Sequence, residues 1–376
     1  MANRFPARAD IVGSYLRPDY LHRARRDFAS GAIDRDALTA IEDRAITELV
    51  EHQKAAGLKV ITDGEFRRAF WHIDFLENLN GVEGYVPEAG YNQQFKGKAA
   101  PSYNIRVSGR ISFNAEHPFL AHFAFLKKAA ETGDESVAKA TIPSPTMILR
   151  QELLANDGSS RLSEIYPSLE EFYADLATTY RDAVKAFYAA GCRYLQFDDT
   201  NWAFLADATK QQEIKDRGLD PQEIASICAR IINESLADKP DDMRITTHIC
   251  RGNHASSWLF SGGYEPVAEQ LFSTAYDGFF LEYDNDRSGD FAPLRHWSNN
   301  GSKVVLGLIT SKFAELEDAE VIKARIQEAT QYIPLENLCL SPQCGFASTE
   351  EGNKVSEQAQ WDKIRLICDI AEQVWG

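Results

Sequence analysis

The feature that most constrains the fold of this 376-residue chain is a unit that recurs eight times: a short apolar run that ends in polar residues, followed by a helical pattern. Nearly continuous apolar runs are typical of strands in a parallel sheet that is buried on both faces. We predict strands at Asp10–Gly13, Lys59–Asp63, Lys139–Pro143, Arg193–Asp198, Arg244–Ile249, Gly278–Tyr283, Lys303–Ile309 and Leu338–Pro342. Eight strand–helix pairs predict an α/β fold, a (β/α)8 TIM barrel, with residues 1–376 in a single domain.

The segments between these strands carry helix signals. The clearest helix spans Leu169–Ala190, because Ser168 and Glu171 form a capping box at its start and Gly191 follows its last turn. Its predicted apolar stripe consists of Leu169, Phe172, Tyr173, Leu176, Tyr180 and Phe187. Further helices are predicted at Leu38–Ala56, Val321–Tyr332 and Val355–Trp375.

One segment interrupts the repeat. Residues 80–138 separate the second predicted strand from the third, which is a long connection for a compact domain. Within it, Tyr103–Val107 and Arg110–Phe113 flank Ser108-Gly109 as in a β-hairpin, and Phe119–Glu131 has a helical pattern. We predict that this hairpin-plus-helix insertion is a lid over a site or a contact between copies of the chain in a homo-oligomer.

Charge and composition narrow the classes of partner. The net charge of −16 disfavours nucleic acid and anionic membrane surfaces. No apolar run approaches the length of a membrane helix and no signal-peptide core opens the chain, so we expect a cytoplasmic protein. The expected partner is a small molecule.

Two of the six cysteines stand in polar, loop-like surroundings, whereas the other four lie in apolar ones where a buried thiol is the simplest interpretation. His248 and Cys250 are two residues apart at the end of a predicted strand, so their side chains point the same way. Glu282 and Cys344 close two later strands. A lone His-x-Cys pair is more often part of a core, but these four together favour tetrahedral zinc.

Other polar residues follow the predicted strands, at the face where active sites of TIM barrels are built. They include Ser14, Glu65, Asp198, Asp199 and the run Thr310-Ser311-Lys312. Each acid has a structural alternative, because a carboxylate after a strand can simply cap the next helix.

The order of these motifs resembles the catalytic domain of cobalamin-independent methionine synthase. The matching motifs are Gly13-Ser14, Asp63-Gly64-Glu65 with Arg68, Gln196-x-Asp198-Asp199, His248-x-Cys250, Glu282 and Pro342-x-Cys344-Gly345. The resemblance implies a (β/α)8 barrel, zinc held by His248, Cys250, Glu282 and Cys344, and homocysteine held by Ser14, Glu65 and Asp198. It implies methyl transfer to a small thiol, with methionine as the product.

Two departures from this family concern the methyl donor. Leu149-Arg150-Gln151 stands where the family carries an Asn-Trp pair that contacts the pterin, and Lys312 lies in the segment that carries a methyl-transfer histidine. We also expect no second barrel to hold a folate polyglutamate tail. Recognition of the thiol acceptor is therefore predicted more firmly than a folate donor, and a methylcorrinoid or small methylated compound stays open.

In this interpretation Glu65 and Asp198 bind the ammonium group of the acceptor, and Arg67, Arg68 or Arg251 binds its carboxylate through a bidentate fork. The predicted catalytic residues are Glu65, Asp198 and Lys312. The alternatives are alkyl transfer to another thiol, a metal-dependent barrel hydrolase that activates water, and a structural or thiol-sensing zinc protein.

Overall fold

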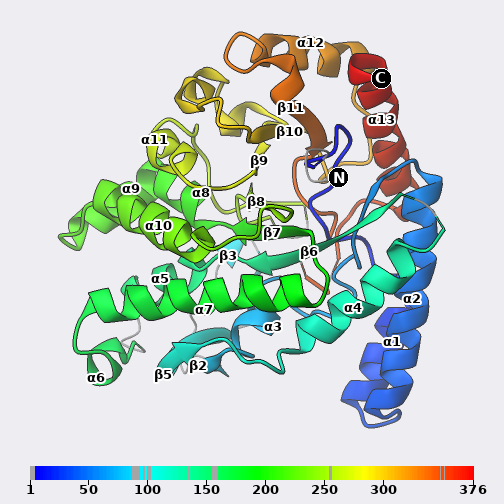
Figure 1. Ribbon diagram of the computed structural model, residues 1–376. Helices are drawn as coiled ribbons and strands as arrows, with labels where there is room; N and C mark the ends of the chain where they lie inside the picture. Colours follow the sequence, from blue (N-terminus) through cyan, green and yellow to red (C-terminus); the bar gives the residue numbers. More distant parts are fainter. Residues whose placement is uncertain are drawn as a thin grey trace.

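The computed structural model describes residues 5–86, 94–95, 98–99, 103–133, 135–154, 160–253, 256–347, 349–350 and 352–376. A curled parallel sheet of seven strands forms its centre, in the spatial order β1-β6-β7-β8-β9-β10-β11 (Figure 1). The strands are β1 (Val60–Ile61), β6 (Val137–Pro143), β7 (Tyr194–Asp199), β8 (Arg244–Ile249), β9 (Gly278–Glu282), β10 (Lys303–Ile309) and β11 (Leu338–Pro342). The predicted parallel α/β architecture is confirmed.

The first predicted strand, Asp10–Gly13, is not a regular strand. The segment around it makes one isolated parallel bridge from Ala9 to Leu340 of β11 and another from Ser14 to Gly64, just after β1. The Asp10 amide donates to the Leu340 carbonyl oxygen at 3.0 Å, and the Tyr15 amide donates to the Gly64 carbonyl oxygen at 3.2 Å. Residues 9–14 therefore connect the two edges of the sheet, and we call this segment the seam.

Helices cover the outer side of the sheet, and successive helices pack side by side (Figure 1). The long ones are α2 (Arg35–Ala55), α4 (Pro118–Ala130), α7 (Leu169–Ala189), α10 (Pro221–Leu236), α12 (Ala319–Ala329) and α13 (Glu357–Trp375). The others are α1 (Asp19–Ala29), α3 (Ile73–Leu76), α5 (Thr146–Leu153), α6 (Leu162–Ile165), α8 (Asn201–Ala206), α9 (Ala208–Asp216) and α11 (Ala268–Phe272). Among the helices described, none combines the length and apolar character that a bilayer crossing requires.

Helix α7 begins as predicted, because the Ser168 side chain accepts a hydrogen bond from the Glu171 amide. The predicted apolar stripe is buried with one exception. Leu169 is 46% exposed, since it is the first residue of the helix and projects beyond the neighbouring packing. The stripe that reaches the core therefore starts one turn later, at Phe172 and Tyr173.

The predicted hairpin in residues 80–138 is wrong. Its two halves form one continuous strand, β5 (Asn104–Ser112), which pairs antiparallel with β2 (Asn80–Tyr85). Pairing shifts by three positions after Asn80, where Gly81 has a φ of 76° and lies so close to the Arg110 carbonyl that a Cβ would clash. Residues 108–111 of β5 therefore stand opposite Gly81 alone, so Ser108-Gly109 lies in a bulge and not in a turn.

The remaining part of this segment is only partly described. Two short strands, β3 (Gln94–Phe95) and β4 (Lys98–Ala99), pair antiparallel, while residues 87–93, 96–97, 100–102 and 134 lie outside the described residues. Helix α4 contacts β6, α2 and α7, so it belongs to the helix layer around the sheet. The segment is therefore not one separate insertion, and its role as a lid or oligomer contact stays a prediction.

Two apolar clusters stabilise the fold. The large one fills the space between sheet and helices, and the small one consists of Val12, Phe280, Val305 and Cys339 on the opposite side of the strands. A buried polar group lies beside the small cluster: the Lys139 ammonium is 3.2 Å from Asp10, and the Tyr194 hydroxyl donates to Asp10 at 2.8 Å. Asp10, in the seam, therefore bonds to side chains of both β6 and β7.

Candidate active site

The four predicted metal ligands come together at the carboxyl ends of the strands. His248 is on β8 with Cys250 directly after it, Glu282 is the last residue of β9, and Cys344 follows β11 by two residues. All four are buried, and their ligand atoms lie within 4.8 Å of one another. Because the strands are parallel and neighbouring, their ends meet at one place even though the ligands are far apart in sequence.

The donor set fits a zinc ion. The sulfur atoms of Cys250 and Cys344 are 3.7 Å apart. Zn–S bonds of about 2.3 Å in a tetrahedron place two sulfur atoms about 3.8 Å apart, whereas the bond of a disulfide is about 2.0 Å. Both ring nitrogens of the buried His248 lack a hydrogen-bond partner among the described residues. Such unsatisfied nitrogens are costly in an interior unless they meet a ligand.

The Glu282 carboxylate is held from several sides. One oxygen accepts from the Arg251 amide at 2.9 Å and from the Asn253 side chain at 2.6 Å, and the other accepts from Arg287 at 2.6 Å. Burial acts to raise the pKa of Glu282, but the neighbouring cations, Lys312 first, outweigh it and lower the pKa. Glu282 is therefore ionised and oriented, as a metal-binding carboxylate has to be.

Asp198 lies beside the metal ligands because β7 and β8 pair in the register that sets Asp198 opposite His248. Gln196 donates to its carboxylate at 2.6 Å. The pKa of Asp198 is raised to about 7, because burial and the charge of Glu65 raise it more than His248 lowers it. Two neighbouring buried acids whose pKa values are both raised form a place where a cation would restore both charges.

Glu65 reaches this place through an unusual backbone. Gly64 and Glu65 both have left-handed conformations, with φ of 67° and 60°. A non-glycine residue pays a strain cost there, and such strain collects at functional sites. The Glu65 carboxylate is 3.4 Å from the Arg68 guanidinium and accepts from the Thr141 hydroxyl at 3.1 Å. Burial raises its pKa, and Arg68 opposes the shift.

Ser14 packs against the loop that carries Cys344. Its hydroxyl accepts from the Ala347 amide at 3.3 Å. A Cβ at position 345 would lie 2.0 Å from the Ser14 hydroxyl oxygen, so only glycine fits there. The seam and the loop after β11 therefore approach each other closely beside the metal ligands.

Lys312 lies near the ligands Glu282 and Cys344. Its side chain is buried, its nitrogen is 3.9 Å from Asp284, and within the described part of the chain it makes no hydrogen bond. Burial lowers the pKa of Lys312, while Glu282 and Asp284 oppose the shift. Lys312 also lines a small polar cavity together with Asn253 and Gly345. Its side chain therefore lies next to the metal ligands with N–H groups that can still donate hydrogen bonds.

Two of the predicted arginines are placed elsewhere. Arg67 pairs with Glu42 at 3.2 Å and with Asp43, both on α2. Arg251 donates to the Gly262 carbonyl at 2.7 Å and lies over the Tyr264 ring. Only the backbone amide of Arg251 reaches the site, at Glu282. Of the three predicted arginines, Arg68 lies beside the Glu65 carboxylate, while Arg17 donates to the Glu65 carbonyl oxygen at 2.7 Å.

The sequence alone was compatible with either a functional or a helix-capping role for Asp199. In the structure its contacts are structural. Its carboxylate accepts from the Asn201 amide at 2.7 Å and from the Thr146 hydroxyl at 2.7 Å. It thereby holds the first turn of α8 against the start of α5. Asp199 lies one residue before the N-cap Thr200, so it supports the start of α8 without being the cap residue that the motif predicted.

Asn253 and Arg287 were not predicted as site residues, although each donates to Glu282. Asn253 lies three residues after Cys250, and this short separation in sequence was the available signal. Arg287 lies in a 3₁₀ turn after β9, where Asn285 accepts from its amide. An arginine five residues after a strand-end acid is too common a pattern to predict this contact.

A family model described as the catalytic domain of cobalamin-independent synthase matches residues 156–372. Among curated proteins, the chain is 48% identical over 371 residues to YxjH of Bacillus subtilis, a protein named as uncharacterised, with 98% of this chain and 95% of that protein covered. It is 24% identical over 337 residues to the methionine synthase of Pyrococcus horikoshii, with 89% and 85% covered.

Solved structures are also similar. A Listeria monocytogenes protein proposed to be a vitamin-B12-independent methionine synthase is 47% identical, with a TM-score of 0.77 and with 99% of this chain and 98% of that chain covered. A B12-independent methionine synthase from Shewanella sp. W3-18-1, solved in complex with selenomethionine, is 20% identical with a TM-score of 0.69, and 98% and 97% of the chains are covered. Because the identity to the Shewanella protein is only 20%, this similarity shows a shared fold and nothing further.

Proposed function

The chain belongs to the cobalamin-independent methionine synthase family, and we propose that it is a zinc-dependent methyltransferase whose acceptor is a small thiol, with homocysteine first and methionine the product. The observation that carries the proposal is the juxtaposition of two features. His248, Cys250, Glu282 and Cys344 converge on one point, and the acids Asp198 and Glu65 interact electrostatically beside them. A thiol bearing an ammonium group fits both.

When bound, zinc would keep the acceptor sulfur as a nucleophilic thiolate at neutral pH, where a free thiol with a pKa of about 8.5 is mostly protonated. The chain's own residues position the rest of the acceptor. Asp198 and Glu65 bind the ammonium group and regain their charges in doing so. Ser14, close to Gly345, limits the space on the seam side.

We assign Lys312 to the methyl donor. Its ammonium has no hydrogen bond within the described residues and lines the polar cavity next to Cys344. Where the methyl group departs from a nitrogen atom, Lys312 can donate the proton that this nitrogen takes up. In this proposal the side chains of Arg251 and Arg67 do not bind the substrate, because Arg251 donates to the Gly262 carbonyl and Arg67 lines a different pocket.

For the donor itself, we propose a methylcorrinoid or a small methylated compound ahead of methylfolate polyglutamate. Gln151, on α5, offers no aromatic surface for a pterin. Stacking of that kind contributes about 0.5–1.5 kcal/mol beyond burial, so its loss weakens folate binding without preventing it.

Steady-state assays with purified, zinc-loaded protein and homocysteine test this proposal when each donor is supplied in turn. We expect methionine to form, and faster with a methylcorrinoid or small methylated donor than with methyltetrahydrofolate triglutamate. Absence of S-methylation with every donor and with several thiols would refute the function. Faster turnover of the folate would refute only the choice of donor.

A further inference from the structure

A second cavity lies away from the metal ligands, between α1, α2 and the loop that follows β1. Its volume is about 470 Å³, which is in the range of small-molecule pockets. Four arginines line it, Arg25, Arg26, Arg35 and Arg67, together with the acids Glu42, Asp74 and Glu350. In a chain of net charge −16 this is a local gathering of positive charge.

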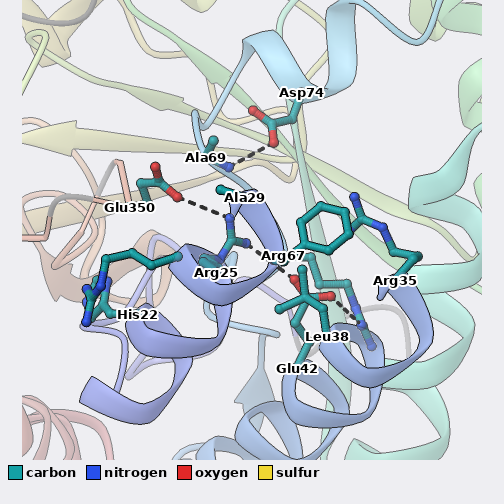
Figure 2. A pocket seen from close by; sticks show the side chains of 12 residues that line it. His22, Arg25, Ala29, Arg35, Leu38, Glu42, Arg67, Ala69, Asp74 and Glu350 are labelled. Carbon is teal, nitrogen blue, oxygen red and sulfur yellow. Dashed lines mark hydrogen bonds and ion pairs between the residues drawn. The ribbon is translucent and has the colours of Figure 1, made fainter. Parts of the chain in front are cut away.

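Two of the arginines form a fixed base of the cavity. Arg25 lies between Glu350 and Glu42, at 3.2 and 3.5 Å, and donates to the Phe66 carbonyl oxygen at 2.6 Å (Figure 2). Glu42 also pairs with Arg67. The side chains of Arg25, Glu42 and Arg67 are largely buried and hold one another in place, so they are a rigid part of the wall.

The three acids of the cavity already have ion-pair or hydrogen-bond partners in the protein. Glu42 and Glu350 are in the ion pairs with the base, and Asp74 accepts from the amides of Ala69 and Phe70, both at 2.8 Å. Asp34, next to the cavity, caps α2 by accepting from the Ala37 amide. No carboxylate among the described residues pairs with Arg26 or Arg35.

The two arginines without a carboxylate are at the exposed side of the cavity. Arg26 is in the last turn of α1, and Arg35 is the first residue of α2, where its guanidinium lies 4.2 Å from the centre of the Phe28 ring. Guanidinium forks match carboxylate and phosphate groups in geometry and charge. Phe28 and Leu38 supply an apolar wall between them.

We infer that this cavity binds a small organic anion that carries two or more carboxylate or phosphate groups on an apolar skeleton. Arg26 and Arg35 bind the anionic groups, and Phe28 and Leu38 contact the skeleton. The inference is independent of the reaction at the metal ligands. It also accounts for Arg67, whose carboxylate-binding role near Glu65 the structure replaces by a place in this wall.

Isothermal titration calorimetry tests the inference with two probes, tricarballylate for carboxylates and pyrophosphate for phosphates. We expect saturable binding of at least one probe to the wild type. The double variant Arg26→Ala/Arg35→Ala should weaken it at least about tenfold, as for the loss of charge-assisted hydrogen bonds. Arg23→Ala is the matched control, because Arg23 is exposed on α1 but does not line the cavity.

The pattern of results distinguishes a carboxylate ligand from a phosphate ligand. Binding of tricarballylate alone indicates a carboxylate ligand, binding of pyrophosphate alone a phosphate ligand, and binding of both the shared anion chemistry. Since both probes also chelate metals, the titration is repeated on Cys344→Ser. Binding that disappears in Cys344→Ser, that weakens equally in Arg23→Ala, or that is absent with both probes would overturn the inference.

Discussion

Cys250 and Cys344 differ from the other buried thiols in what surrounds them. Burial raises the pKa of Cys192 to about 12 and that of Cys339 to about 11, so these thiols stay protonated and serve the core. Cys250 instead has the sulfur of Cys344 at 3.7 Å, and ligand atoms of His248 and Glu282 lie within 4.8 Å of these sulfurs. Only this pair has the environment of metal-binding thiolates.

We therefore predict about one equivalent of zinc per chain, and its loss in Cys250→Ser and in Cys344→Ser. Both variants should stay folded, because the apolar clusters do not depend on the metal. Cys368→Ser, on α13, is the control and should keep its zinc. Metal analysis after gel filtration measures the content. Less than about a tenth of an equivalent in the zinc-supplied wild type would contradict a four-ligand site.

Asp198 leads to a prediction about selectivity. Asp198→Asn keeps the size of the side chain but removes the charge that we assign to the acceptor's ammonium group. Apparent binding of homocysteine should weaken by on the order of 2–5 kcal/mol, as for a buried charge pair. Binding of 4-mercaptobutanoate, which lacks the ammonium, should change little. Steady-state constants for both thiols give the comparison, and an equal loss for both would assign Asp198 a purely structural role.

Among the elements, α4 has an unusual first turn. The Nδ1 atom of His117 accepts from the Phe119 amide at 3.2 Å, so Nε2 carries the proton and donates to the Phe75 carbonyl oxygen at 3.0 Å. Burial lowers the pKa of His117 to about 4. A neutral imidazole thus caps the helix and ties it to α3.

This cap predicts a pH dependence of stability. Between pH 6.5 and 4 the unfolded chain binds a proton at His117 that the folded chain does not, so stability falls as the pH drops through this window. From pH 7 to 5 the contribution is about 2 kcal/mol. His117→Asn can still cap the helix but cannot titrate, so urea unfolding should show a smaller loss between these pH values. His52→Asn, at an exposed position on α2, should lose as much stability as the wild type; an unchanged loss in His117→Asn would contradict the assignment.

At the scale of the whole molecule, the seam depends on one buried ion pair. The side chains of Lys139 and Asp10 are fully buried, and Asp10 also accepts from the Tyr194 hydroxyl and from two backbone amides, of Ala7 and Ile11. Burial lowers the pKa of Lys139, and Asp10 opposes the shift. Removing Lys139 or Asp10 leaves the other residue buried without its ion-pair partner. The two residues differ in the hydrogen bonds that then remain to them.

We predict that Asp10→Ala lowers the free energy of unfolding by about 3–5 kcal/mol, because it leaves the Lys139 ammonium without its carboxylate. Lys139→Met should cost less, since Asp10 keeps its hydroxyl and amide donors. Asp27→Ala, at an exposed position on α1, should change stability by less than about 0.5 kcal/mol. Chemical unfolding of the three variants is the measurement. Equal effects of Asp10→Ala and Lys139→Met would show that the ion pair does not act as described.

The parts of this architecture that follow from local pattern could be predicted from sequence. Apolar runs located the seven strands, and parallel pairing then brings His248, Glu282 and Cys344 together whatever separates them in the chain. Contacts that depend on loop conformation could not be predicted. Two left-handed residues at Gly64-Glu65 turn the next segment so that Arg68 reaches Glu65 while Arg67 reaches α2.

The predicted hairpin failed for a related reason. Ser108-Gly109 has the composition of a turn, but a bulge that packs against a glycine of another strand, here Gly81, has the same composition. The irregular seam was predicted as a strand because its residues are apolar. Its two isolated bridges accompany the close packing of Ser14 against Gly345 and the polar contacts of Asp10. These partners are distant in sequence, so no short stretch of sequence predicts them.

The seam also sets an order of events during synthesis on the ribosome. Ala9 leaves the ribosome long before its partner Leu340, and at about 5–20 residues per second the interval is roughly 20 s to 1 min. Lys139 and Tyr194 emerge in between, so Asp10 can find its buried partners while β8–β11 do not yet exist. For that interval the nascent sheet grows with one edge open, and only the arrival of β11 lets it close.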